Sequence, residues 1–142
     1  MKATASACLM GALLWLVSGE CSAAEPRDHY MIHCMGCHGE DGAGLPGAVP
    51  DLRRDFARLV SSGVGRDYIL RLPGVNQAGL DAQDTASVLN WILVNLANPV
   101  GNSSQAPFTA AEILAARRQP LLELSALRAS ILGEARDSAD LP

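Results

Sequence analysis

Residues 33–39 read HCMGCHG, and the paired cysteines beside a histidine constrain the fold more than any other feature of the chain. Cys34 and Cys37 lie three positions apart, and His38 follows the second cysteine directly. Cysteines this close in sequence form a disulfide, bind a metal or attach a cofactor, and the cellular compartment decides among these outcomes. The targeting information in the N-terminus therefore comes next.

The N-terminus has the parts of a secretory signal peptide. Lys2 supplies a positive start, residues 7–17 form a short apolar run, and residues 22–24 are small, as a cleavage point requires. The apolar run is shorter than the ~20 residues that a membrane span needs, so a retained anchor is disfavoured. We therefore expect residues 1–24 to be a signal peptide, and the mature chain to be exported to the periplasm without a stable membrane anchor.

Four interpretations compete for the cysteine motif in an exported chain. In the first, Cys34 and Cys37 form thioether bonds to a haem, and His38 ligates its iron. In the second, the two cysteines join His29 and His33 in a structural zinc site, although the rotation between helical turns makes a tetrahedron awkward. The third is a thiol redox pair, which lacks a surrounding βαβ pattern, and the fourth is an inert disulfide.

The spacing of the motif favours covalent haem c. Two intervening residues let both sulfurs reach the two vinyl groups from one helical turn, and the next residue is then aimed beneath the iron. Aromatic residues make up only 4% of the chain, so a small core partly filled by a cofactor is expected. We expect one haem c, attached through Cys34 and Cys37, with its iron ligated by His38.

Helical periodicity and loop composition predict an all-α fold. Glycine and proline crowd residues 36–50, which indicates a long loop. The clearest helix covers residues 81–97, with acidic residues in its first turn and Asn98-Pro99 ending it. No segment alternates convincingly with period two. The helices are expected at residues 26–35, 52–60, 66–72, 81–97 and 109–118, the last with a capping box at Thr109 and Glu112, and in the stretch 121–135.

The composition divides the mature chain into two parts. Residues 25–97 are expected to form the cofactor domain, and residues 98–142 a linker followed by a C-terminal helical extension. The leucine spacing of the extension is more typical of packing within the chain than of docking to a partner. The formal net charge of −4 argues against a nucleic-acid partner and suits a partner with a positive docking face.

The run CMGCHGEDGAGLPGAVPDL and the later LNWIL resemble a class I cytochrome c of the small bacterial type, over residues 25–97. The resemblance implies a cytochrome c-like fold of several short helices around one haem, and one-electron transfer between periplasmic redox proteins. It implies that Tyr30 packs against Trp91 where two helices cross beside the haem. It also implies that the Pro50 carbonyl accepts the second ring proton of His38.

The sequence departs from this family on the distal side of the haem. The family supplies a methionine ligand from a loop before the last core helix, but this chain has no methionine beyond Met35. A gapless alignment places Val75 where that sulfur would lie, and valine cannot ligate iron. Asn76 and Gln77 adjoin this position and offer an amide oxygen as a weak ligand, or a hydrogen bond to a bound ligand.

Other arrangements of the distal side stay open at this point. His29, His33, Met31 and Met35 belong to the helix that carries the thioethers, so reaching the opposite face of the haem is difficult for them. The iron is otherwise five-coordinate, or takes a ligand from the tail or another chain, although the tail holds no Met, His, Cys or Lys. We predict a distal side without a strong protein ligand.

Arginines after Pro50 are candidates for contact with a haem propionate, because a guanidinium pairs with a carboxylate in bidentate geometry. Arg71 is preferred as the arginine nearest the distal loop in sequence. No acid, base or nucleophile constellation accompanies the motif, so an electron carrier rather than an enzyme is expected. The alternatives are a five-coordinate haem protein that binds or senses a small gas, and the haem subunit of a periplasmic dehydrogenase.

Overall fold

The computed structural model describes residues 24–97, 105–121 and 123–133, and these residues form helices joined by loops, without a strand. The predicted all-α class is confirmed for this part of the chain. Residues 1–23 of the predicted signal peptide, residues 98–104 of the predicted linker and residues 134–142 of the predicted extension lie outside the described residues. The helices are α1 (Pro26–His33), α2 (Met35–His38), α3 (Leu52–Val60), α4 (Gly63–Arg71), α5 (Pro73–Asn76), α6 (Ala82–Asn95), α7 (Ala110–Ala116) and α8 (Leu124–Leu132).

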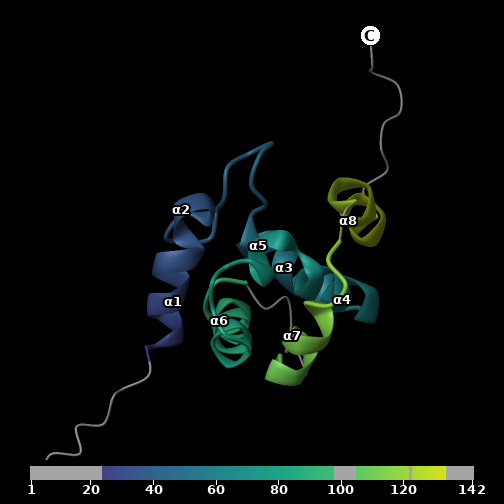
Figure 1. The fold of residues 1–142 in the computed structure, drawn as a ribbon. Helices are drawn as coiled ribbons and strands as arrows, with labels where there is room; N and C mark the ends of the chain where they lie inside the picture. The colour runs from purple at the N-terminus through teal and green to yellow at the C-terminus, as the bar shows by residue number, and fades with distance from the viewer. Residues whose placement is uncertain (1–23, 98–104, 122, 134–142) are drawn as a thin grey trace, which may run out of the picture.

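The helices are arranged around α3, α4 and α6, with the two ends of the described chain on opposite sides (Figure 1). α1 packs on α6, while α7 packs on α4 and α6, and α8 packs on α3 and α4. Ile113 of α7 and Leu132 of α8 are buried in the same apolar core as Tyr30 of α1. The extension therefore packs within the chain, as its leucine spacing predicts.

Several helix starts follow from capping chemistry that the sequence already shows. α3 begins after Asp51, whose carboxylate accepts a hydrogen bond from the Arg53 amide at 2.9 Å. α7 begins with the predicted capping box, in which Thr109 and Glu112 each accept a hydrogen bond from the other's backbone amide. Each contact satisfies a backbone N–H that the helix leaves free, so these boundaries are fixed locally.

Several observed helices differ in their bounds from the predicted ones, and two of the differences have a local explanation. The helix predicted over residues 26–35 is divided at Cys34, whose backbone leaves the helical region with φ −122°. The helix predicted over residues 66–72 begins earlier, at Gly63, because the Ser62 side chain accepts from the Gly65 amide at 3.0 Å. A side chain at Gly65 would overlap a backbone carbonyl of α3, so glycine lets α4 approach α3 closely.

The segment after Leu72 was expected to be a loop, but Pro73–Asn76 forms the single turn α5. Proline suits the first position of a helix, where its missing N–H has no partner to lose. The amides of Asn76 and Gln77 donate to the carbonyls of Leu72 and Pro73, both at 2.9 Å. The turn therefore gives a defined backbone to the segment that precedes α6.

A buried carboxylate ties the extension to the core. Asp55 of α3 is only 1% exposed, and its carboxylate pairs with Arg54 and with Arg128 of α8. Arg58 of α3 also donates to the Leu132 carbonyl at 3.0 Å. A buried carboxylate is stable only when it is paired, so these contacts stabilise the packing of α8 on α3. None of the helices that the structure describes combines the length and the hydropathy that a membrane span requires.

Candidate functional site

Cys34, Cys37 and His38 form one tight turn, hereafter the attachment turn, at the junction of α1 and α2. The Cys34 carbonyl accepts hydrogen bonds from the amides of Cys37 at 3.2 Å and His38 at 3.0 Å. Both cysteines are free thiols; Cys37 is exposed and Cys34 is half-buried, and burial raises the pKa of the Cys34 thiol. The structure thus presents two free sulfurs from one turn, without the bond between them that the disulfide interpretation requires.

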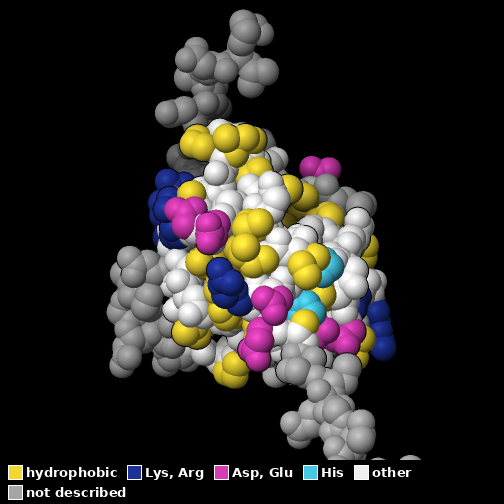
Figure 2. Space-filling model, turned by 90° about the vertical axis from the view of Figure 1, so that its left-hand side faces the viewer, with side chains coloured by type: hydrophobic (Ala, Val, Ile, Leu, Met, Phe, Trp, Pro, Cys, Tyr) yellow, Lys and Arg dark blue, Asp and Glu magenta, His cyan; other side chains and the backbone are white. Residues whose placement is uncertain are grey.

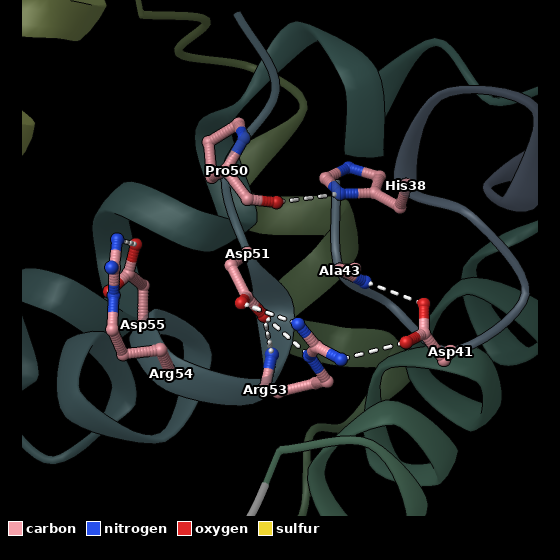
Figure 3. A network of polar contacts seen from close by, with 8 residues as sticks. All are labelled: His38, Asp41, Ala43, Pro50, Asp51, Arg53, Arg54 and Asp55. Carbon is pink, nitrogen blue, oxygen red and sulfur yellow. Dashed lines mark hydrogen bonds and ion pairs between the residues drawn. The ribbon is translucent and has the colours of Figure 1, made fainter. Parts of the chain in front are cut away.

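The imidazole of His38 is oriented by Pro50, which the resemblance names for this role (Figure 3). The ring Nδ1 lies 3.2 Å from the Pro50 carbonyl oxygen. A carbonyl only accepts hydrogen bonds, so Nδ1 carries the proton and a neutral ring keeps a free lone pair on Nε2. Burial lowers the pKa of His38 and so favours the neutral form of the ring, which can ligate a metal, although the Pro50 hydrogen bond acts in the opposite direction.

Gly44 allows the loop to bring Pro50 to the ring. Its φ of +68° lies in the region that favours glycine, and its amide donates to the His38 carbonyl at 2.7 Å. A side chain at this position would overlap the carbonyl oxygens of Val49 and Pro50. The turn that orients His38 therefore depends on the absence of a side chain at Gly44.

A charged network joins the two arms of the same loop (Figure 3). Arg53 donates to Asp41 at 2.7 Å and to Asp51 at 2.9 Å, and Asp41 also accepts from the Ala43 amide at 3.1 Å. The hydrogen bond from Arg53 lowers the pKa of Asp51. Sequence reasoning missed this network, although acidic residues at both ends of a Gly-rich loop followed by an arginine were a usable signal.

Tyr30 and Trp91 meet where α1 crosses α6. Their ring centroids are 5.2 Å apart with an interplanar angle of 36°, and Tyr30 is fully buried. The Tyr30 hydroxyl donates to the Gly39 carbonyl at 2.6 Å. Burial is the main reason that the pKa of Tyr30 is raised to about 12, so this phenol remains a donor. The hydroxyl contact was not foreseen, and it ties α1 to the residue after His38.

The remaining candidate iron ligands of α1 and α2 contact other groups of the protein. His29 Nε2 lies 3.5 Å from the Asp84 carboxylate of α6, and its ring is 6.1 Å from that of the exposed His33. Met31 and Met35 pack against the hydrophobic core. Within the described residues, no group of three or more His, Cys, Asp and Glu side chains could hold a metal ion, so the zinc interpretation gains no support.

The predicted distal residues lie on or beside α5. Val75 is half-buried and packs against the core, as do Cys34 and Met35 of the attachment turn. The side-chain amide of Asn76 is buried, and neither its oxygen nor its nitrogen has a hydrogen-bond partner within the described part of the chain. Gln77 is exposed. Of the two polar candidates, only Asn76 turns its amide into the protein.

Arg71 is held by other groups in this structure. Its Nη1 donates to Asp67 at 2.9 Å, and its Nε donates to the Gln119 carbonyl at 2.6 Å. Its contact with a propionate stays a prediction. Arg117, which sequence reasoning did not single out, donates to the Leu80 carbonyl at 2.8 Å and to the Thr85 hydroxyl at 3.1 Å.

The residues that the structure brings together fit a covalent haem. Two free thiols on one turn match the two vinyl groups, and the imidazole keeps a lone pair for iron on Nε2. The unpartnered amide of Asn76 is an orphaned buried group of the kind that a missing ligand would satisfy. Cys34, Cys37 and His38 are therefore the residues that could hold haem and its iron.

Comparison with known proteins agrees with this chemistry. No family model matches the chain. A cytochrome c-552 of Thermus thermophilus is 28% identical over 124 residues, which cover 75% of this chain and 84% of that protein. Another Thermus thermophilus cytochrome c-552 is 28% identical over 106 residues, which cover 62% of this chain and 81% of that protein. This distant similarity supports a c-type cytochrome.

Proposed function

We propose that the protein is an exported class I c-type cytochrome, which carries one electron at a time between periplasmic redox partners. The observation that carries the proposal is the single turn of Cys34, Cys37 and His38, with the His38 ring oriented by the Pro50 carbonyl. The similarity to the two cytochromes c-552 supports the same chemistry. In this proposal haem c is attached to both cysteines and its iron is ligated by His38.

The residues of the site divide the work of holding and tuning the cofactor. The haem, when bound, supplies a one-electron iron couple. The two thiols would hold it covalently, and His38 would ligate its iron through Nε2. Pro50 raises the basicity of His38 by accepting its Nδ1 proton. Tyr30 and Trp91 brace the crossing of α1 and α6 beside this turn.

The surface around the attachment turn supports brief encounters with partners. Figure 2 views the molecule from the side of α1 and shows hydrophobic side chains in the middle of this face, with acidic and basic side chains around them. Cys37 is exposed, and Ile32 of α1 is 72% exposed. Small apolar contact areas suit fast exchange between carriers, and a chain of net charge −4 suits a positive partner.

The periplasmic setting belongs to the proposal as well. Residues 1–24 act as a cleaved signal peptide, and the electron donor and acceptor are periplasmic proteins, with a dehydrogenase as one candidate. Among the described residues nothing resembles a catalytic acid, base and nucleophile set, so the protein is proposed to be a carrier and not an enzyme.

A second candidate function is the binding or sensing of a small gas by five-coordinate haem. It is favoured by the lack of any methionine beyond Met35 together with the buried, unpartnered amide of Asn76. A haem without a strong distal ligand has a lower reduction potential than one with methionine, unless burial compensates, and it keeps a position free. The third candidate is a dehydrogenase subunit docked through the extension, which is less favoured because α7 and α8 pack on the core.

The decisive experiment is expression with the native N-terminus in cells that mature c-type cytochromes. The expected product is coloured and lacks residues 1–24. Its mass exceeds that of the bare polypeptide by one haem, which stays attached to the chain after denaturation. Replacing both cysteines, Cys34→Ser with Cys37→Ser, should remove the covalent haem. A colourless wild-type product at the bare polypeptide mass overturns the proposal. Carbon monoxide binding by the ferrous form then separates the gas-binding candidate from the plain carrier.

A further inference from the structure

We propose that Asn76 is the distal hydrogen-bonding residue of this protein. Its side-chain amide contacts a small neutral ligand, either water or a diatomic gas, at the sixth coordination position of the haem iron. The proposal rests on the proposed function, because it requires a haem at Cys34, Cys37 and His38, and it follows the second candidate, in which the sixth coordination position of the iron is free of a protein ligand. It assigns a specific residue to the side of the cofactor where the sequence offers no strong ligand.

The first support is the unmet hydrogen bonding of Asn76. Its side-chain nitrogen and oxygen are both buried, and neither has a partner among the residues that the structure describes. A buried polar group without a partner destabilises the folded state, so such groups are rare and point to a missing ligand or water. The neighbouring Gln77 is exposed and carries no such cost.

The second support is the apolar character of the inner side of α5. Val75 is half-buried and packs against the hydrophobic core. Within α5, Gly74 is exposed, whereas Val75 and Asn76 are half-buried. The inward side of α5 thus combines an apolar side chain with an unpartnered amide.

The chemistry of these groups selects the class of ligand. An amide offers one donor and one acceptor group without a net charge. Leu72, Val75 and Ala78 are partly buried hydrophobic neighbours along the same segment, and an apolar setting penalises a charged ligand. A small uncharged molecule that binds iron and hydrogen-bonds to an amide satisfies both conditions.

The third support is that the segment carrying Asn76 is fixed at both ends by the C-terminal extension. Before α5, Arg71 donates to the Gln119 carbonyl at 2.6 Å. After α5, the Leu80 carbonyl accepts from Arg117 at 2.8 Å. Polar side chains contribute most to ligand binding when they are held in place beforehand, and these two contacts hold the backbone on either side of Asn76.

The test uses the full-length holoprotein and carbon monoxide as the probe of the ferrous form. Asn76→Leu removes the amide at nearly constant size, and Asn95→Leu makes the same change at an exposed asparagine of α6. Intact mass first establishes that each variant carries covalent haem. The measurements are the C–O stretching frequency, which falls when a donor contacts the bound ligand, and the carbon monoxide dissociation rate.

The expected result is a higher C–O frequency in Asn76→Leu and a dissociation rate roughly 2- to 12-fold faster, as the loss of one hydrogen bond predicts. Asn95→Leu should match the wild type in both. An Asn76→Leu protein indistinguishable from the wild type overturns the proposal, and so does a wild type that binds no carbon monoxide. If Asn76→Leu does not fold, Asn76→Ala is measured and interpreted in the same way. A wild type without covalent haem is a separate result, because it refutes the proposed function itself.

Discussion

The Tyr30 hydroxyl donates a 2.6 Å hydrogen bond to the carbonyl oxygen of Gly39, the residue that follows His38. Tyr30 is fully buried and its ring packs on Trp91, so the phenol is held in place by α6. His38 is therefore held through its backbone neighbour as well as through its ring. This contact links the crossing of α1 and α6 to the orientation of the histidine that is proposed to ligate the iron.

Replacing Tyr30 with phenylalanine tests this contact. The ring packing on Trp91 is kept, but the Gly39 carbonyl loses its donor, so the free energy of unfolding should fall by about 1–3 kcal/mol. The reduction potential should also shift, because the His38 backbone becomes less constrained. Denaturant unfolding and redox titration of the holoprotein measure both effects. Tyr68→Phe changes another buried tyrosine, and it should leave the potential unaltered. Equal potentials in the two variants contradict the prediction.

Gly44→Ala should disturb the orientation of His38. The new side chain overlaps the carbonyl oxygens of Val49 and Pro50, so the Pro50 oxygen moves away from the imidazole. A weaker acceptor lowers the basicity of the ligand and raises the reduction potential. Overpacking of this kind typically destabilises a protein by roughly 1–3 kcal/mol.

Gly47→Ala is the matched control for Gly44→Ala. Gly47 has a similar backbone conformation, with φ +77° against +68° at Gly44, but a side chain there meets no atom within 4 Å. Both variants share the cost of a left-handed alanine, and only Gly44→Ala should change the potential and the absorption spectrum. If Gly47→Ala changes the spectrum as much, backbone strain rather than displacement of Pro50 is responsible.

Arg117→Ala should loosen the segment that carries α5. Arg117 joins α7 to the Leu80 carbonyl, while the neighbouring Arg118 side chain is exposed. Hydrogen exchange of the backbone N–H groups of Asn76 and Gln77 should become faster in Arg117→Ala and remain unchanged in Arg118→Ala. Equal exchange in both variants would show that the extension does not restrain α5.

The ion pair between Arg66 and Glu112 should make stability depend on acidity. Its two oxygen contacts of 2.8 and 3.0 Å lower the pKa of Glu112 from 4.5 to about 2, chiefly through the Arg66 hydrogen bonds. A depressed carboxyl pKa stabilises the folded state above the unfolded value, and this contribution is lost as the pH falls from 4.5 towards 2. Because Glu112 is partly exposed, the effect is moderated by solvent.

Glu112→Gln should flatten this acid-side decline of the free energy of unfolding. Denaturant titrations between about pH 2 and pH 6 measure the slope, and the exposed Glu123→Gln serves as a control with the wild-type slope. The capping contact with the Thr109 amide survives in part, because glutamine also accepts a hydrogen bond. An unchanged slope in Glu112→Gln would assign the acid sensitivity to other carboxylates.

The residues alone determined the attachment motif, the all-α class and much of the helix pattern. Cys34, Cys37 and His38 are close in sequence, so one turn brings them together independently of the tertiary packing. The capping box at Thr109 is equally local, and the structure reproduces it. The short turn α5 was not predicted, because four residues carry too little periodicity to distinguish a turn from a loop.

Tertiary structure decided what depends on residues far apart in the chain. The Arg117 contact with Leu80, the pairing of Asp55 with Arg128 and the buried, unpartnered amide of Asn76 all arise where separate helices meet. No local pattern encodes them, since the partner of a side chain is fixed only when the core packs. The sequence therefore specifies which groups can hold a haem iron, whereas the packing of α5 and the extension determines the surroundings of Asn76, which is proposed to face the other side of that iron.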